Sequence, residues 1–79
     1  MVEFMEVWSE PCVSMADLMA RLATEFAGQF IFTKVDIDEQ PVLRDKYKIE
    51  NIPTLLVFRE GQVTRQEIGQ LNEQEIRSL

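Results

Sequence analysis

The first half of the chain places a short apolar strand, a long amphipathic helix and a second apolar strand in succession. Residues Val2 to Val7 form an apolar run interrupted by Glu3 and Glu6, which predicts a strand. Residues Phe30 to Ile37 predict a second strand, and their apolar character predicts burial on both faces, as in a parallel sheet. Between them, apolar side chains recur at helical spacing and predict a core-facing stripe: Met15, Leu18, Met19, Leu22, Ala23 and Phe26. This unit is expected to have a right-handed crossover.

Local signals mark both ends of the predicted helix. Ser9 is among the preferred N-cap residues, and Pro11 is tolerated in a first turn because its missing N–H needs no partner there. Gly28 suits the left-handed position that ends a helix. The helix is therefore expected to begin directly after Trp8.

The second half continues with short elements. They are a turn and helix start at 38–41, a short helix to about Tyr47, a strand at 54–58, a tight turn at Glu60-Gly61 and a strand at 62–68. Asn72 and Glu75 resemble a capping box that opens a last helix, with Ile76 and Leu79 on its inner face. The 62–68 strand alternates poorly and is expected at an edge. The order is β-α-β-α-β-β-α in one domain, residues 1–79.

Composition excludes several classes of function. The chain has 79 residues with one cysteine and no histidine, which excludes an intramolecular disulfide, a zinc finger and a histidine-based active site. No metal or cofactor is expected. A net charge of −6 opposes binding to nucleic acids and to anionic membranes. No apolar run has the length of a membrane span and the first residues do not resemble a signal peptide, so a cytoplasmic setting is expected.

Two motifs give this order of elements a family resemblance. The segment from Val2 to Cys12 is similar to the thioredoxin strand that leads into Trp-Cys-x-Pro-Cys. The segment from Tyr47 to Phe58, followed by Glu60-Gly61, resembles the part of thioredoxins that carries a cis-proline and an antiparallel hairpin. The resemblance implies an α/β, thioredoxin-like fold with a mixed four-stranded sheet flanked by helices and strands ordered second, first, third, fourth. It also resembles the thioredoxin-like domains of multidomain monothiol glutaredoxins and of chaperone-like thioredoxin proteins.

The resemblance implies a site in which the attacking sulfur is missing. Ser9 stands at the position of the nucleophilic cysteine, and Cys12 stands at the position of the resolving cysteine. A serine hydroxyl is too weak an acid to replace a thiolate in disulfide exchange, so the two-thiol cycle is closed. Glu10 replaces a usual glycine and disfavours a nearby thiolate. Cys12 is then either a small buried hydrophobe or a single reactive thiol.

The other implied site residues concern peptide binding and proton transfer. Trp8, Glu10 and Pro11 flank the site, although Trp8 also fits a core aromatic residue. Ile52, Pro53 and Thr54 correspond to the cis-proline segment, whose backbone pairs with an extended substrate; a plain turn proline is the alternative. Glu3 and Lys34 correspond to the buried acid and lysine of the family; here a structural buried pair is expected. Lys48 stands where glycine is common, which costs about 1 kcal/mol if the backbone is left-handed there.

Family members usually carry a strand and a helix before the segment that begins here. Without them, the strand at Phe30–Ile37 becomes an open edge, which predicts a homodimer through that edge or a chain that is part of a longer protein. The alternative is that the shorter set of elements suffices alone, as it does in glutaredoxin-like folds. The expected function is a redox-inactive or single-thiol module that binds a protein or peptide at the Trp8/Cys12/Pro53 surface. The alternatives are a natural or engineered active-site variant of a protein-disulfide reductase, and a single-thiol redox protein that uses Cys12.

Overall fold

The computed structural model describes residues 1–79 as a mixed sheet between helices. The elements are β1 (Val2–Met5), α1 (Glu10–Glu25), β2 (Thr33–Asp36), α2 (Pro41–Lys46), β3 (Thr54–Arg59), β4 (Gln62–Ile68) and α3 (Glu73–Arg77). The predicted order of strands and helices is confirmed. None of the helices has the length and apolar character needed to cross a membrane.

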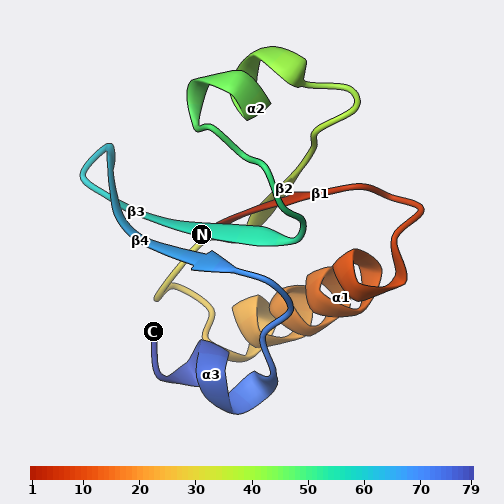
Figure 1. The fold of residues 1–79 in the computed structure, drawn as a ribbon. Helices are drawn as coiled ribbons and strands as arrows, with labels where there is room; N and C mark the ends of the chain where they lie inside the picture. Colours follow the sequence, from red (N-terminus) through yellow and green to blue (C-terminus); the bar gives the residue numbers. More distant parts are fainter.

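The strands form a four-stranded sheet in the order β2-β1-β3-β4, as predicted. β1 is parallel to β2 and antiparallel to β3, and β3 and β4 form an antiparallel hairpin. Figure 1 shows α2 on one side of the sheet and α1 with α3 on the other. The long helix therefore returns across the sheet, so that β1 and β2 can run in the same direction.

Apolar side chains fill both faces of the sheet. The predicted α1 stripe is core: Met15, Met19 and Leu22 are buried against Leu55 of β3 and against Leu71 and Ile76 near the C-terminus. On the α2 side the buried residues are Phe4, Ile49 and Leu56. Because successive side chains of a strand alternate between faces, β1 contributes to both cores.

The second strand is shorter and more exposed than predicted. Only Thr33–Asp36 forms β2, and Thr33 and Lys34 are exposed, so the prediction of burial on both faces was wrong. Before it, Phe30 and Phe32 pack against the α1 core from a loop while Ile31 is 83% exposed. The first part of the predicted strand is therefore a loop, and Phe30 and Phe32 hold this loop against the core. β2 does lie at an edge of the sheet, and its pairing with a second copy stays a prediction.

The boundaries of β1 and α1 also differ from the prediction. β1 ends at Met5, and Val7 is exposed. Ser9 occupies the N-cap position but makes no side-chain cap hydrogen bond, and the helix ends at Glu25 rather than at Gly28. Gly28 has a left-handed backbone in the turn that follows. Gly28 therefore predicted the turn after the helix correctly, but the helix itself ends earlier, at Glu25.

The capping box of α3 is confirmed and fixes the C-terminal helix. Asn72 Oδ1 accepts a hydrogen bond from the Glu75 amide at 2.8 Å, and Glu75 Oε1 accepts one from the Asn72 amide at 3.0 Å. Arg77 then joins α3 to α1 through Glu25 at 2.9 Å and also pairs with Glu73 at 2.8 Å. These exposed pairs order a helix of only 5 residues.

Lys48 has a φ of 55°, in the left-handed region that was suspected from the sequence. Replacing it with glycine removes the steric conflict of the Cβ atom, so Lys48→Gly is expected to raise the free energy of unfolding by about 0.5–1 kcal/mol. Urea denaturation measures the change. The control Lys46→Gly, within α2, should lower the stability instead, because glycine is unfavourable inside a helix. A loss of stability in Lys48→Gly would contradict the prediction.

Candidate functional site

The candidate site lies where β1 ends, α1 begins and β3 begins. Residues 6–9 form the loop from β1 into α1, and Phe4 of β1 pairs with Thr54 at the start of β3. This register brings the segment before Thr54 to the same end of the sheet as the first turn of α1. The structure thus assembles two segments that are about forty residues apart in the sequence.

Cys12 is completely buried in the first turn of α1, with 0% of its surface exposed. Its neighbours are Met5 of β1 and Ala16 of α1, and Ile52 packs against the same cluster. The thiol is free and has no second cysteine to pair with. Burial removes Cys12 from direct attack by solvent reagents, so the first turn of α1 holds it as a small hydrophobic side chain.

Ser9 stands at the N-terminus of α1, on the partly exposed side of the same turn. Its amide donates to Glu6 O at 3.1 Å, and its carbonyl accepts the first helical hydrogen bond, from the Val13 amide, at 3.0 Å. Its side chain makes no cap bond. Glu10 and Pro11 are exposed beside it, and Glu10 accepts a hydrogen bond from Ser14. Ser9 is therefore partly exposed, whereas the only cysteine is buried in the core.

The segment opposite the helix start is turned by a proline. The Ile52–Pro53 peptide bond is cis, Pro53 is buried and Ile52 is half-buried. Thr54 is 1% exposed, and its hydroxyl donates to Asn51 O at 2.6 Å. The Pro53 carbonyl accepts a hydrogen bond from the Gly69 amide at 2.8 Å. The segment is thus held rigidly from β4 while Ile52 stays in contact with the cluster around Cys12.

Trp8 is an exposed aromatic residue and not part of the core. Its exposed fraction is 71%, so the alternative that it is a core residue was wrong. The adjacent Val7 is 61% exposed, and it lies on the surface although the apolar run predicted it within a strand. Val7 is the last residue of that apolar run and comes directly before Trp8, and this position was the sequence feature that could have indicated its exposure. The loop before α1 therefore exposes two neighbouring apolar side chains.

An acidic rim borders this loop and was also missed from the sequence. Glu6 follows β1, and Asp36 and Asp38 lie at the end of β2, the strand that pairs with β1. Desolvation raises the pKa of the Glu6 carboxyl, and the neighbouring Asp38 carboxylate raises it further. Parallel strands end at the same edge of a sheet, which is why these acids meet. The rim gives the end of the sheet next to the Trp8 loop a negative charge.

Glu3 is a buried carboxyl group without a hydrogen-bond partner. It is 0% exposed, and neither side-chain oxygen is bonded. It pairs with Leu55 across the sheet, and Leu55 belongs to the core under α1. Burial raises the pKa of the Glu3 carboxyl to about 7, and the Lys34 ammonium only partly offsets this.

The expected buried pair of Glu3 with Lys34 is wrong in one respect. The two residues are neighbours in the register of β1 and β2, but Lys34 is exposed and forms no ion pair with Glu3. The position of β2 at the sheet edge gives the flexible lysine side chain access to water, where its charge is better solvated. Glu3 therefore remains alone in the interface between β1 and α1.

Comparisons with known proteins agree with this architecture. The sequence model of thioredoxins matches residues 1–79. The thioredoxin of Staphylococcus aureus is 36% identical over 69 residues, which are 87% of this chain and 66% of that protein. The chain thus spans 66% of the length of the curated relatives that it matches.

Two solved structures share the fold. One is described as the structure of a malarial protein; it has a TM-score of 0.87, 17% identity, and the match covers 98% of this chain and 86% of that one. The other is the germline-specific thioredoxin Deadhead of Drosophila melanogaster, with a TM-score of 0.87, 23% identity, and coverage of 98% and 72%. At these identities the likeness shows the fold alone.

Glu3 should make the stability depend on pH in a defined direction. Between pH 4.5, the ordinary value, and about 7, the folded protein keeps a proton on Glu3 that the unfolded chain has released. The free energy of unfolding therefore falls as the pH rises through this window, by up to about 3 kcal/mol from this group. Glu3→Gln removes this contribution, which urea denaturation at several pH values measures.

The matched control is Glu39→Gln, an exposed position between β2 and α2. It should keep the slope of stability against pH that the unmodified chain has. If Glu3→Gln and the unmodified chain show the same slope from pH 4.5 to 7, the buried carboxyl is not the group responsible.

Proposed function

This chain belongs to the thioredoxin family, and we propose that it acts there as a protein-binding module without two-thiol redox chemistry. It is a redox-type family member with a single cysteine. The observation that carries the proposal is the separation of the two halves of the site: the thiol of Cys12 is buried, whereas Trp8 is exposed. This separation supports binding through the exposed side chains rather than chemistry at the thiol.

The surface consists of Val7, Trp8, Ile52 and the buried Pro53 behind them, which we call the Trp8 surface. An exposed indole and a half-buried isoleucine beside a rigid turn suit an extended peptide with apolar side chains. The partner is a protein or peptide segment, and the acidic rim at Glu6 favours neutral or basic segments. Cytoplasmic action is proposed with it, because a lone free thiol is kept reduced there.

Two alternatives use the cysteine. In a substituted disulfide reductase, Ser9 replaces the nucleophile and the rest of the site is kept, with Glu3 as the buried acid. In a single-thiol redox protein, Cys12 itself reacts. The burial of Cys12 weighs against the second alternative, because Met5 and Ala16 cover the sulfur and a substrate disulfide cannot reach it.

The chain should not accelerate the reduction of insulin disulfides by dithiothreitol, because the attacking thiol is missing and Cys12 is buried. Ser9→Cys supplies a thiol at the start of α1 and should gain activity; the control Ser14→Cys, one turn further along the same helix, should not. In the unmodified chain, thiol labelling of Cys12 should be at least about a hundredfold slower in the folded than in the unfolded state. Activity of the unmodified chain, or rapid labelling, would favour the single-thiol alternative.

Binding at the Trp8 surface is tested with an unfolded basic polypeptide, such as reduced lysozyme whose cysteines are blocked with uncharged carbamidomethyl groups. Trp8→Ala should weaken binding about fivefold or more, because a central exposed aromatic residue carries much of such an interface. Val42→Ala is the matched control, since Val42 is 77% exposed on α2. Amide chemical shifts in a titration report both affinity and position. Equal effects of the two substitutions would contradict the assignment of the surface.

A further inference from the structure

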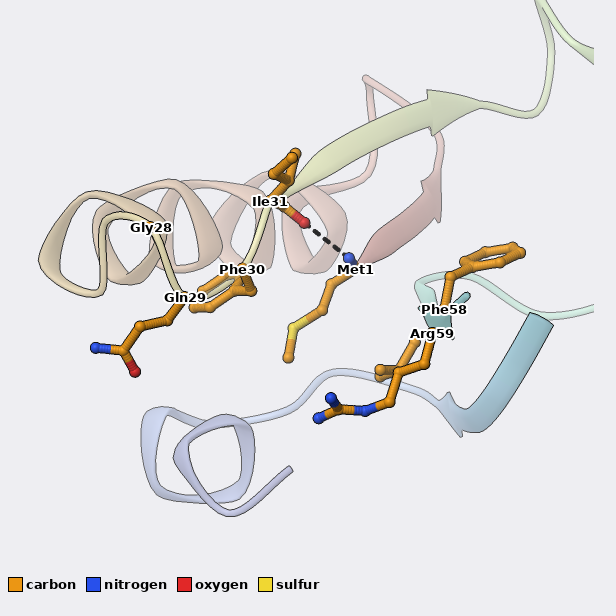
Figure 2. A pocket seen from close by; sticks show the side chains of 8 residues that line it. Met1, Gly28, Gln29, Phe30, Ile31, Phe58 and Arg59 are labelled. Atoms are coloured by element: carbon orange, nitrogen blue, oxygen red, sulfur yellow. Dashed lines mark hydrogen bonds between the residues drawn. The ribbon is translucent and has the colours of Figure 1, made fainter. Parts of the chain in front are cut away.

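The sheet ends at β4, and the outer side of this strand has no partner strand. β4 is the last strand in the order β2-β1-β3-β4, and it pairs with β3 alone. Neither end of the chain borders this edge. Met1 N donates to Ile31 O at 2.7 Å on the β2 side of β1 (Figure 2). Arg77 near the other end pairs with Glu25 of α1. The edge is therefore formed by residues inside the chain.

The register of the β3–β4 hairpin shows which residues of β4 direct their polar backbone groups outward. The Gly69 amide donates to Pro53 O at 2.8 Å, so the backbone groups of Gly69 face β3. Neighbouring residues of a strand alternate in the direction of their N–H and C=O groups, and the register is regular from residue 65 to 68. The backbone groups of Glu67 and Arg65 consequently face β3 as well. Those of Gln66, between them, point away from the sheet.

The sequence of β4 is complementary to that of a second copy in antiparallel orientation. In a two-fold arrangement centred on Gln66, the Gln66 amide of each copy donates to the Gln66 carbonyl of the other. The same register places Arg65 of each copy directly opposite Glu67 of the other. It also places Ile68, which is 60% exposed, opposite Thr64 of the other copy. A second β4 therefore satisfies the outward backbone groups and meets side chains of matching character.

Charge favours this register over its neighbours. Arg65 and Glu67 form an ion pair within one chain at 3.0 Å, and their side chains are 55% and 31% exposed. Two copies centred on Gln66 would arrange these four side chains as a ring of alternating charge. A centre at residue 65 sets arginine against arginine, and a centre at residue 67 sets glutamate against glutamate. Like charges directly opposite one another destabilise a strand pair, so only the Gln66 register is favoured among the three.

The regular part of β4 is short, which limits both the partner and the strength of the contact. A β-bulge lies between the Val57–Arg65 and Phe58–Val63 pairs, so regular pairing begins at Arg65. Bulges and charged side chains protect an edge strand against strands of unrelated sequence. Here they leave a short charged stretch that a second copy of the same stretch complements. Pairing over so few residues buries little area, so we expect a weak, concentration-dependent contact.

We propose that two copies of this chain associate through antiparallel pairing of their β4 strands, centred on Gln66. The pairing joins the two four-stranded sheets into one continuous sheet. Its occupant is a second copy because the alternation of Arg65 and Glu67 is complementary to itself. This interface differs from the one predicted at the strand Phe30–Ile37, which lies at the opposite edge. It is also separate from the Trp8 surface and does not depend on the function proposed there.

The test follows the isotope-labelled 79-residue chain from micromolar to millimolar concentration by analytical ultracentrifugation and amide chemical shifts. The mean mass should rise toward that of a dimer. The amide signals of Gln66 and Ile68 should shift, and their exchange with solvent should slow, because these groups become donors between copies.

Charge reversal tests the register. Arg65→Glu and Glu67→Arg should each weaken the association about tenfold, because each sets like charges opposite one another at two places in the dimer. An equimolar mixture of the two variants should associate at least as strongly as the unmodified chain, because every facing pair is then of opposite charge. Recovery in the mixture also shows that both variants are folded.

Two control variants distinguish pairing of β4 from a general charge effect and from association through the Trp8 surface. Arg44→Glu changes the net charge as much as Arg65→Glu but lies on α2, and it should leave the association unchanged. Trp8→Ala should also leave it unchanged. The proposal is overturned if the chain stays monomeric at millimolar concentration or if the shifts map to residues 33–36 or to the Trp8 surface. It is equally overturned if the mixture associates no more strongly than each variant alone.

Discussion

The packing of α1 against β1 and β3 is the interaction on which the rest of the molecule depends. Met15, Met19 and Leu22 are buried against Leu55, and Cys12 is buried against Met5. This contact turns the first helical turn inward at Cys12 and outward at Ser9. It also covers Glu3, which is why a carboxyl group lies in an apolar interface without a partner. The chemistry of the site is therefore a consequence of how one helix face is packed.

The carboxyl end of β1 collects the exposed aromatic residue and the acidic groups of the candidate site. The loop with Trp8 and the Ile52–Pro53 turn lie at this end of the sheet, because Phe4 of β1 pairs with Thr54 at the start of β3. Glu6, Asp36 and Asp38 form the acidic rim there, since β1 and β2 are parallel and end at the same edge. This end of the sheet therefore presents an exposed indole near negative charge.

Local patterns predicted much of the fold, and they failed where neighbouring elements decide exposure. The α1 stripe and the Asn72–Glu75 capping box depend on residues within one helix, so spacing and side-chain type were sufficient. The exposure of Trp8, Ile31 and Lys34 depends on whether other elements of the fold pack against these side chains. The expected Glu3–Lys34 pair did not form because Lys34 lies on the edge strand β2, where its side chain reaches water. The residues around Lys34 in the sequence do not indicate this exposure.

The sequence by itself determined which chemistry is possible within this chain: a single thiol excludes a two-thiol cycle, whatever the fold. It also determined the order of elements, because hydrophobic periodicity and turn residues act over short distances. Only the tertiary structure decided that Cys12 is buried while Trp8 is exposed, and that the Glu3 carboxyl is buried without a hydrogen-bond partner. These properties arise from the register of strands and from burial, and both depend on contacts between residues far apart in the chain.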